Sequence, residues 1–138
     1  MRVLGIDPST AKPLGFGLVN ERLTVEDSGL CSMFGLQDIL RELKPDLVVV
    51  EDQYMARNFS TSKKLAWCAG KIMGMCAIYK IPNCVMNVAH WKSLMKAQSG
   101  THIQRCKQIF NMDLQDDVAS AVLIATAYLT ENQICDKM

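Results

Sequence analysis

The sequence lacks the features that mark several common classes of protein. No apolar run approaches the roughly 18 residues that a membrane-spanning helix needs, so no membrane segment is expected. The first residues read directly as a β-strand rather than as the apolar region of a signal peptide. Six cysteines are present without a C-x-x-C pair, which argues against a zinc site. We therefore expect a protein of a reducing compartment, the cytoplasm.

Acidic residues are missing from the centre of the chain. All 14 Asp and Glu residues lie at or before Asp52, or at or after Asp113. The span between them carries nine basic residues: Arg57, Lys63, Lys64, Lys71, Lys80, Lys92, Lys96, Arg105 and Lys107. A charge run is usually a solvated surface, but basic residues there are normally interspersed with acids that limit self-repulsion. The segment therefore favours an anionic partner, and nucleic acid is the first candidate.

The hydrophobic pattern predicts one α/β domain over residues 1–138, a length sufficient for a real core. Strands are expected at Met1–Asp7, Leu14–Val19, Leu23–Leu30, Leu47–Val50 and Asn83–Val88. Helices are expected at Leu36–Leu43, Ser60–Tyr79 including its cap, Ala89–Lys96, Thr101–Phe110 and Leu114–Thr130. Three antiparallel strands followed by parallel strands added through crossover helices describe an RNase H-like fold, with a five-stranded mixed sheet flanked by helices.

Carboxylates are predicted at the ends of two buried strands and at the start of the last helix. Asp7 ends the first strand, and Glu51 directly follows the fourth. A third group, Asp113, Asp116 and Asp117, precedes the apolar stripe of the last helix. Taken alone, Asp7 could equally be a turn or capping residue. If the three groups meet, their oxygen ligands suit Mg²⁺ or Mn²⁺, and two such ions could assist phosphodiester cleavage.

Three motifs, in this order, resemble those of the RuvC family of Holliday-junction resolvases. They are GIDP at 5–8 with LGFGLV at 14–19, EDQYMARN at 51–58, and QDDVASAVLIA at 115–125. The resemblance implies a homodimer that binds a four-way DNA junction and, with Mg²⁺ or Mn²⁺, cuts it by paired symmetric nicks. The chain is shorter than cellular members, which suggests a compact viral or otherwise divergent member, acting in the host-cell cytoplasm if viral.

The resemblance also implies a catalytic metal site built from Asp7, Glu51 and Asp117. Asp116 suits an N-cap, where an acid complements the helix dipole, with further help to the metal. Ser120 stands where the family often carries a fourth acid, and it can offer a hydroxyl but no charge. With one carboxylate fewer, the site is expected to bind its second metal ion more weakly, so that cleavage needs high Mg²⁺ or favours Mn²⁺.

DNA contacts are expected from the polar loop after Glu51 and from the basic residues of the central segment. They are Tyr54, Arg57, Asn58, Lys63, Lys64, Lys92, Lys96, Arg105 and Lys107. By resemblance, Tyr54 takes the place of an aromatic that stacks on a DNA base, and Lys92 matches a required lysine. The helix carrying Gly70 and Gly74 corresponds to the family's dimer-forming helix. Both glycines could equally be merely tolerated there.

Three other interpretations fit parts of the sequence. A sugar-kinase or actin-like ATPase also begins with a Gly-Ile-Asp strand, but its fold needs two such domains, so no nucleotide cofactor is expected. A module that binds junctions without cutting them is compatible with Ser120. An RNase H-like nuclease acting on other branched or flapped DNA would use the same site chemistry.

Overall fold

The computed structural model describes residues 1–8, 13–52, 59–97 and 101–136 of the chain. The elements follow the order β1 (Arg2–Asp7), β2 (Leu14–Asn20), β3 (Val25–Cys31), α1 (Met33–Leu43), β4 (Leu47–Asp52), α2 (Phe59–Ile78), β5 (Asn83–Asn87), α3 (Val88–Met95), α4 (His102–Phe110) and α5 (Asp116–Asp136). In the described ranges, no helix is long and apolar enough to span a membrane.

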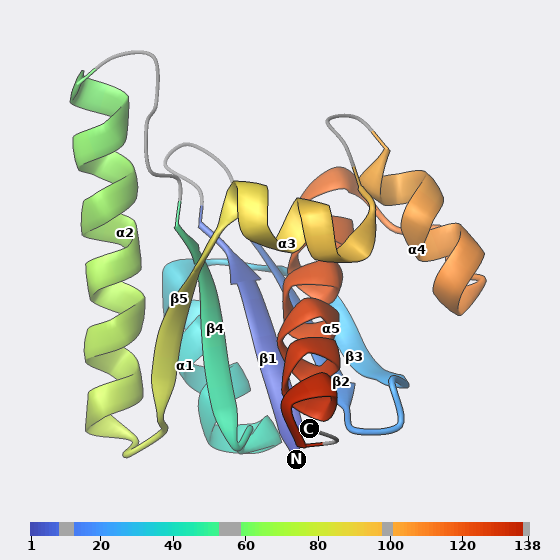
Figure 1. The fold of residues 1–138 in the computed structure, drawn as a ribbon. Coiled ribbons are helices and arrows are strands. Elements are labelled where there is room, and N and C mark those ends of the chain that lie inside the picture. The colour runs from blue at the N-terminus through green and yellow to red at the C-terminus, as the bar shows by residue number, and fades with distance from the viewer. Residues whose placement is uncertain (9–12, 53–58, 98–100, 137–138) are drawn as a thin grey trace.

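The strands form one mixed sheet in the order β3-β2-β1-β4-β5 (Figure 1). β1 is antiparallel to β2 and parallel to β4, and β4 is parallel to β5. This arrangement confirms the predicted RNase H-like sheet, with β3 at one edge. Because β1 and β4 run in the same direction, the residues at their C-terminal ends meet at one edge of the sheet.

Each face of the sheet is covered by its own set of helices. α1 and α2 bury Leu36, Leu40 and Ile72 against one face, and α3, α4 and α5 cover the other. The strands β1 and β4 are consequently buried on both sides, which explains their nearly continuous apolar sequences.

Helix α5 lies directly against the backbone of β1 and β2. A Cβ atom added at Gly5 would lie 2.0 Å from the carbonyl oxygen of Ala121. At Gly17 an added Cβ would lie 2.5 Å from Val122 Cγ2. The absence of side chains at these strand positions is therefore what lets the helix lie so close, with Ala121 at the contact.

Several predicted helix boundaries are wrong. α1 begins at Met33 rather than Leu36. α2 begins at Phe59, so the expected caps at 60–62 lie inside the helix. α5 begins at Asp116 rather than Leu114, and it continues to Asp136 rather than ending at Thr130. The final turns are anchored, because Gln133 donates from Nε2 to the Glu21 carbonyl at 2.8 Å. Local sequence pattern does not reveal such a long-range contact.

Candidate active site

Asp7 and Glu51 lie side by side at the ends of the two central strands. The parallel register pairs Ile6 with Val50, and each acid follows directly. Asp7 is only 8% exposed and Glu51 only 5%. Burying a carboxylate without compensation is costly, so two neighbouring buried acids indicate a functional site rather than a structural one.

Asp117 reaches the same place from the other side of β1. Gly15 is the register partner of Asp7 on β2. A Cβ at Gly15 would lie 2.2 Å from the Asp117 carbonyl oxygen, so the first turn of α5 rests on the strand beside Asp7. The sequence shows Gly15 as one of the glycines alternating with apolar residues in β2, but it does not show that a helix packs there.

Burial raises the pKa of Asp7 to about 8. The charges of Glu51 and Asp117, a hydrogen bond with the Asp117 side chain, and the charge of Asp116 all act in the same direction. At neutral pH, Asp7 is therefore mostly protonated, and its hydroxyl donates to the Asp117 carboxylate. The predicted acids form one electrostatic cluster that holds a proton in the absence of a cation.

The raised pKa predicts that the metal-free protein loses stability as the pH rises. The folded state keeps the Asp7 proton up to about pH 8, whereas the unfolded chain releases it near its ordinary value of 3.8. The unfolding free energy should therefore fall between these limits, by at most about 1.4 kcal/mol per pH unit. Denaturant titrations in EDTA should show this loss, and Asp7→Asn should lack it. Parallel curves for the two proteins would contradict the assignment.

The chemistry of the donor set fits a hard divalent cation, because the ligands are oxygens whose mutual repulsion a cation would relieve. Within the described part of the chain, however, no group of three or more His, Cys, Asp or Glu side chains is arranged to hold an ion.

The other acidic residues near the start of α5, Asp113 and Asp116, make contacts outside the group of Asp7, Glu51 and Asp117. Asp113 is exposed and pairs with Lys107 Nζ at 3.4 Å. Asp116 is not the N-cap that the sequence suggested, because Gln115 accepts from the Ala119 amide and α5 begins one residue later. Asp116 instead contacts the ring of His102. Ser120 is buried one turn beyond Asp116 and Asp117.

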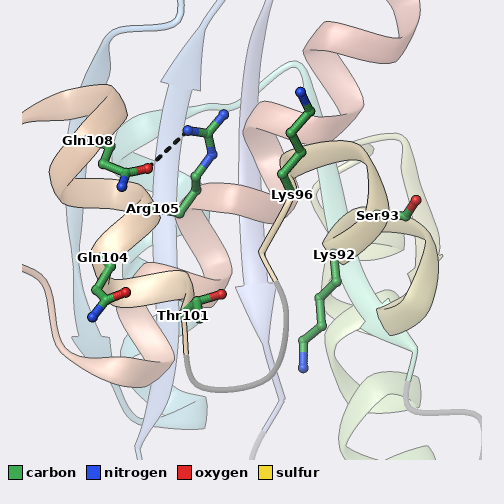
Figure 2. A pocket seen from close by; sticks show the side chains of 7 residues that line it. All are labelled: Lys92, Ser93, Lys96, Thr101, Gln104, Arg105 and Gln108. Carbon is green, nitrogen blue, oxygen red and sulfur yellow. Dashed lines mark hydrogen bonds between the residues drawn. The ribbon is translucent and has the colours of Figure 1, made fainter.

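Three of the predicted DNA-binding residues line a pocket of about 460 Å³ between α3 and α4. Figure 2 shows Lys92 and Lys96 from α3 and the following cap, with Arg105 from α4. The remaining lining residues are Ser93, Thr101, Gln104 and Gln108. Arg105 is held by its Nε–H donating to the Met95 carbonyl at 2.7 Å. The lining is cationic and polar and contains no acid, which is suited to an anion.

Of the described residues predicted to contact DNA, Lys63, Lys64 and Lys107 do not line this pocket. Lys63 and Lys64 are exposed in the first half of α2, and Lys107 lies on α4 in its pair with Asp113. Tyr54, Arg57 and Asn58 fall outside the described residues. The neutral pocket residues carried no signal of their own in the sequence, although the acid-free composition of the segment did indicate an anion-binding surface.

The proteins of similar sequence reported below are named as crossover junction endodeoxyribonucleases. No family model matches the chain. It is 26% identical to the crossover junction endodeoxyribonuclease RuvC of Caldanaerobacter subterraneus, over 100% of this chain and 98% of that protein. It is 32% identical to the protein of the same name from Nitratidesulfovibrio vulgaris, over 58% of this chain and 57% of the relative.

Two solved structures share the fold. Thermus thermophilus RuvC in complex with a Holliday-junction substrate superposes with a TM-score of 0.83 at 17% identity, covering 97% of this chain and 96% of that one. The Fowlpox virus resolvase, solved with Holliday-junction DNA, gives 0.68 at 14% identity, covering 96% and 99%. The chain therefore has an RNase H-like fold. Its sequence is similar to that of a RuvC protein along its whole length.

Proposed function

We propose that the protein is a metal-dependent endonuclease that resolves four-way DNA junctions by paired symmetric nicks, with residues 1–138 acting as one nuclease domain. The observation that carries the proposal is the convergence of Asp7, Glu51 and Asp117 at one edge of a RuvC-like sheet. The relatives bear the name of junction endonucleases, and two structural neighbours were solved with junction DNA. Cys31, Cys76, Cys84 and Cys106 are free thiols, which is consistent with a cytoplasmic location.

Asp7, Glu51 and Asp117 would hold Mg²⁺ or Mn²⁺ in this proposal. Such ions activate water and stabilise the leaving oxygen in phosphodiester hydrolysis. The protein's own part is to carry these carboxylates on two strands and a helix that bring them to one edge of the sheet. Asp7 must give up its proton before it can act as a ligand. Ser120, buried beside them, can donate a hydrogen bond from its hydroxyl.

The pocket between α3 and α4 is suited to the DNA backbone rather than to bases. Lys92, Lys96 and Arg105 supply charge for phosphate, and the amides and hydroxyls around them can bond to phosphate and sugar oxygens. None of the described lining residues is aromatic, so they offer a base no stacking surface. Binding through this pocket should be independent of sequence.

Removing two of the pocket's charges should weaken junction binding. Lys96 has a φ of 54°, where glycine is favoured, so Lys96→Gly removes the charge without straining the backbone. Combined with Arg105→Gln, it should lower affinity for all sequences and reduce the salt slope by about 1 per lost phosphate contact. Arg41→Gln, on the opposite face of the sheet, is the control and should leave the slope unchanged. Equal slopes for all three proteins would exclude the pocket from the DNA path.

We also propose that the protein forms a homodimer through α2. The outer face of this helix presents Trp67, 59% exposed, and Ile78, 76% exposed. Gly70 and Gly74 lie between them, and an added Cβ at either would meet nothing within 4 Å in the described chain. Small residues flanked by large apolar ones allow a second helix to approach closely, and a second copy of α2 offers the same surface.

A charge placed on the outer face of α2 should dissociate the dimer. Trp67→Asp should give a monomer in analytical ultracentrifugation, at concentrations where the parent protein sediments as a dimer. Phe34→Asp makes the same kind of change at an aromatic residue that is 84% exposed on α1, and it should leave the dimer intact. A dimeric Trp67→Asp protein would place the interface elsewhere.

The proposed activity is tested with a synthetic four-way junction, a flap and a linear duplex, each incubated with and without Mg²⁺. We expect paired nicks in opposite strands of the junction, only with the metal ion. Preferential cutting of the flap would instead identify a nuclease for other branched DNA. Junction binding without cleavage in Mg²⁺ or Mn²⁺ would identify a binding module, an outcome that Ser120 makes worth testing.

A further inference from the structure

His102 links the start of α4 to the start of α5. Its Nε2 contacts Oδ1 of Asp116, the first residue of α5. The His102 side chain is only 12% exposed, and Nδ1 is buried with no hydrogen-bond partner among the described residues. Since Nδ1 has no partner among the described residues, the contact with Asp116 favours a ring with its N–H at Nε2, which donates to the carboxylate.

This contact is poorly explained as a device for stability. The Asp116 side chain is 63% exposed, so its hydrogen bond adds little to the unfolding free energy. Burying Nδ1 without a partner is unfavourable. Helix α4 already packs on α5 through buried Cys106, whose Sγ donates to the Ala119 carbonyl at 3.5 Å. A buried unsatisfied group that contributes little to stability is a reason to look for a functional role.

Asp116 lies next to the candidate site at the start of α5. It immediately precedes Asp117, whose backbone rests against Gly15, the register partner of Asp7. Ser120, one turn further along α5, has no charge to contribute. An acid held at the start of the helix could therefore provide the negative charge that Ser120 does not.

We propose that His102 is a positioning residue for the metal site. By donating to one oxygen of Asp116, it holds this carboxylate beside Asp117, so that its other oxygen adds negative charge to the ligand set. Hydrogen-bond partners that orient a metal-site carboxylate typically change metal affinity about 10–100-fold when removed. The inference rests on the proposed metal-dependent function, but it concerns only His102, Asp116 and the ion.

His90 provides a matched control. It is the other histidine in the chain, and its Nε2 also pairs with an acid of α5, Glu131, at 3.0 Å. Glu131 lies near the opposite end of α5 from Asp116. A purely structural link between helices would make both histidines equivalent, whereas the proposal assigns an effect on metal binding to His102 alone.

The test is the affinity of the DNA-free protein for Mn²⁺, measured from the electron paramagnetic resonance signal of free Mn²⁺. His102→Ala should bind at least about tenfold more weakly than the parent, and His102→Gln, which keeps an N–H donor, should recover most of the loss. His90→Ala should match the parent. In an Asp116→Asn background, His102→Ala should cause little further loss, because the two residues act through one hydrogen bond.

Thermal denaturation of each variant in EDTA separates folding from metal binding. If His102→Ala does not fold, His102→Phe takes its place, because the ring fills the buried space without a donor. The inference is overturned if the variant binds Mn²⁺ like the parent, or if its full loss persists in the Asp116→Asn background. Failure of the parent itself to bind Mn²⁺ would instead overturn the proposed metal site.

Discussion

The Asp7→Asn protein should bind junctions but fail to cut them. Asp7 is a buried carboxyl between Glu51 and Asp117, and an amide cannot supply the charge that a divalent ion requires. Loss of several kcal/mol of transition-state stabilisation corresponds to a rate at least about 10³-fold lower. Denaturing gels give the rate with Mg²⁺, and mobility shifts in EDTA give the affinity.

Asp38→Asn is the control for Asp7→Asn. Asp38 is an exposed acid on α1, where it pairs with Arg41, and its loss should change neither rate nor affinity. A parental cleavage rate for Asp7→Asn would mean that the strand-end acids are not the nuclease site. A variant that neither cuts nor binds would point to a damaged fold, which denaturation in EDTA would reveal.

The Gly15→Ala protein should lose both stability and cleavage. The added Cβ would lie 2.2 Å from the Asp117 carbonyl oxygen, a contact that only movement of α5 can relieve. Overpacking of this kind typically costs about 1–3 kcal/mol of unfolding free energy. Because the displaced backbone is that of Asp117, the acid would also move away from Asp7, and cleavage should fall more than the fraction of folded protein does.

Gly29→Ala is the matched control for this effect. The same methyl group on β3 would lie 3.4 Å from Phe16 Cε1, which is close to ordinary contact, so both stability and cleavage should stay near parental values. Urea denaturation and the gel assay measure both properties. A Gly15→Ala protein as stable and active as the parent would show that the close approach of α5 to β2 is not required.

The sequence was sufficient to place Asp7 and Glu51 together. Both acids follow apolar runs, which are the mark of strands buried on two faces, and parallel strands bring their C-terminal ends to one edge. The helix boundaries around 59–62 and 114–116 were less predictable, because several polar residues in a row could cap each helix. The structure, not the local sequence, shows which residue begins it.

Contacts between distant segments could not be predicted. Nothing in the sequence indicates that Gly15 underlies Asp117, or that the histidine at 102 reaches Asp116 across the turn between α4 and α5. The pocket between α3 and α4 likewise depends on how two short helices pack on α5. An amphipathic pattern predicts that the apolar face of a helix is buried, but not which residues pack against it.

The central claim is that the strand-end acids and the start of α5 form one metal site. The most direct test is a crystal structure of the protein with Mn²⁺, in which anomalous scattering locates the ions. The account predicts a peak bounded by Asp7, Glu51 and Asp117 that disappears in Asp7→Asn crystals. Mn²⁺ bound elsewhere on the protein, with no peak between these three carboxylates, would contradict it.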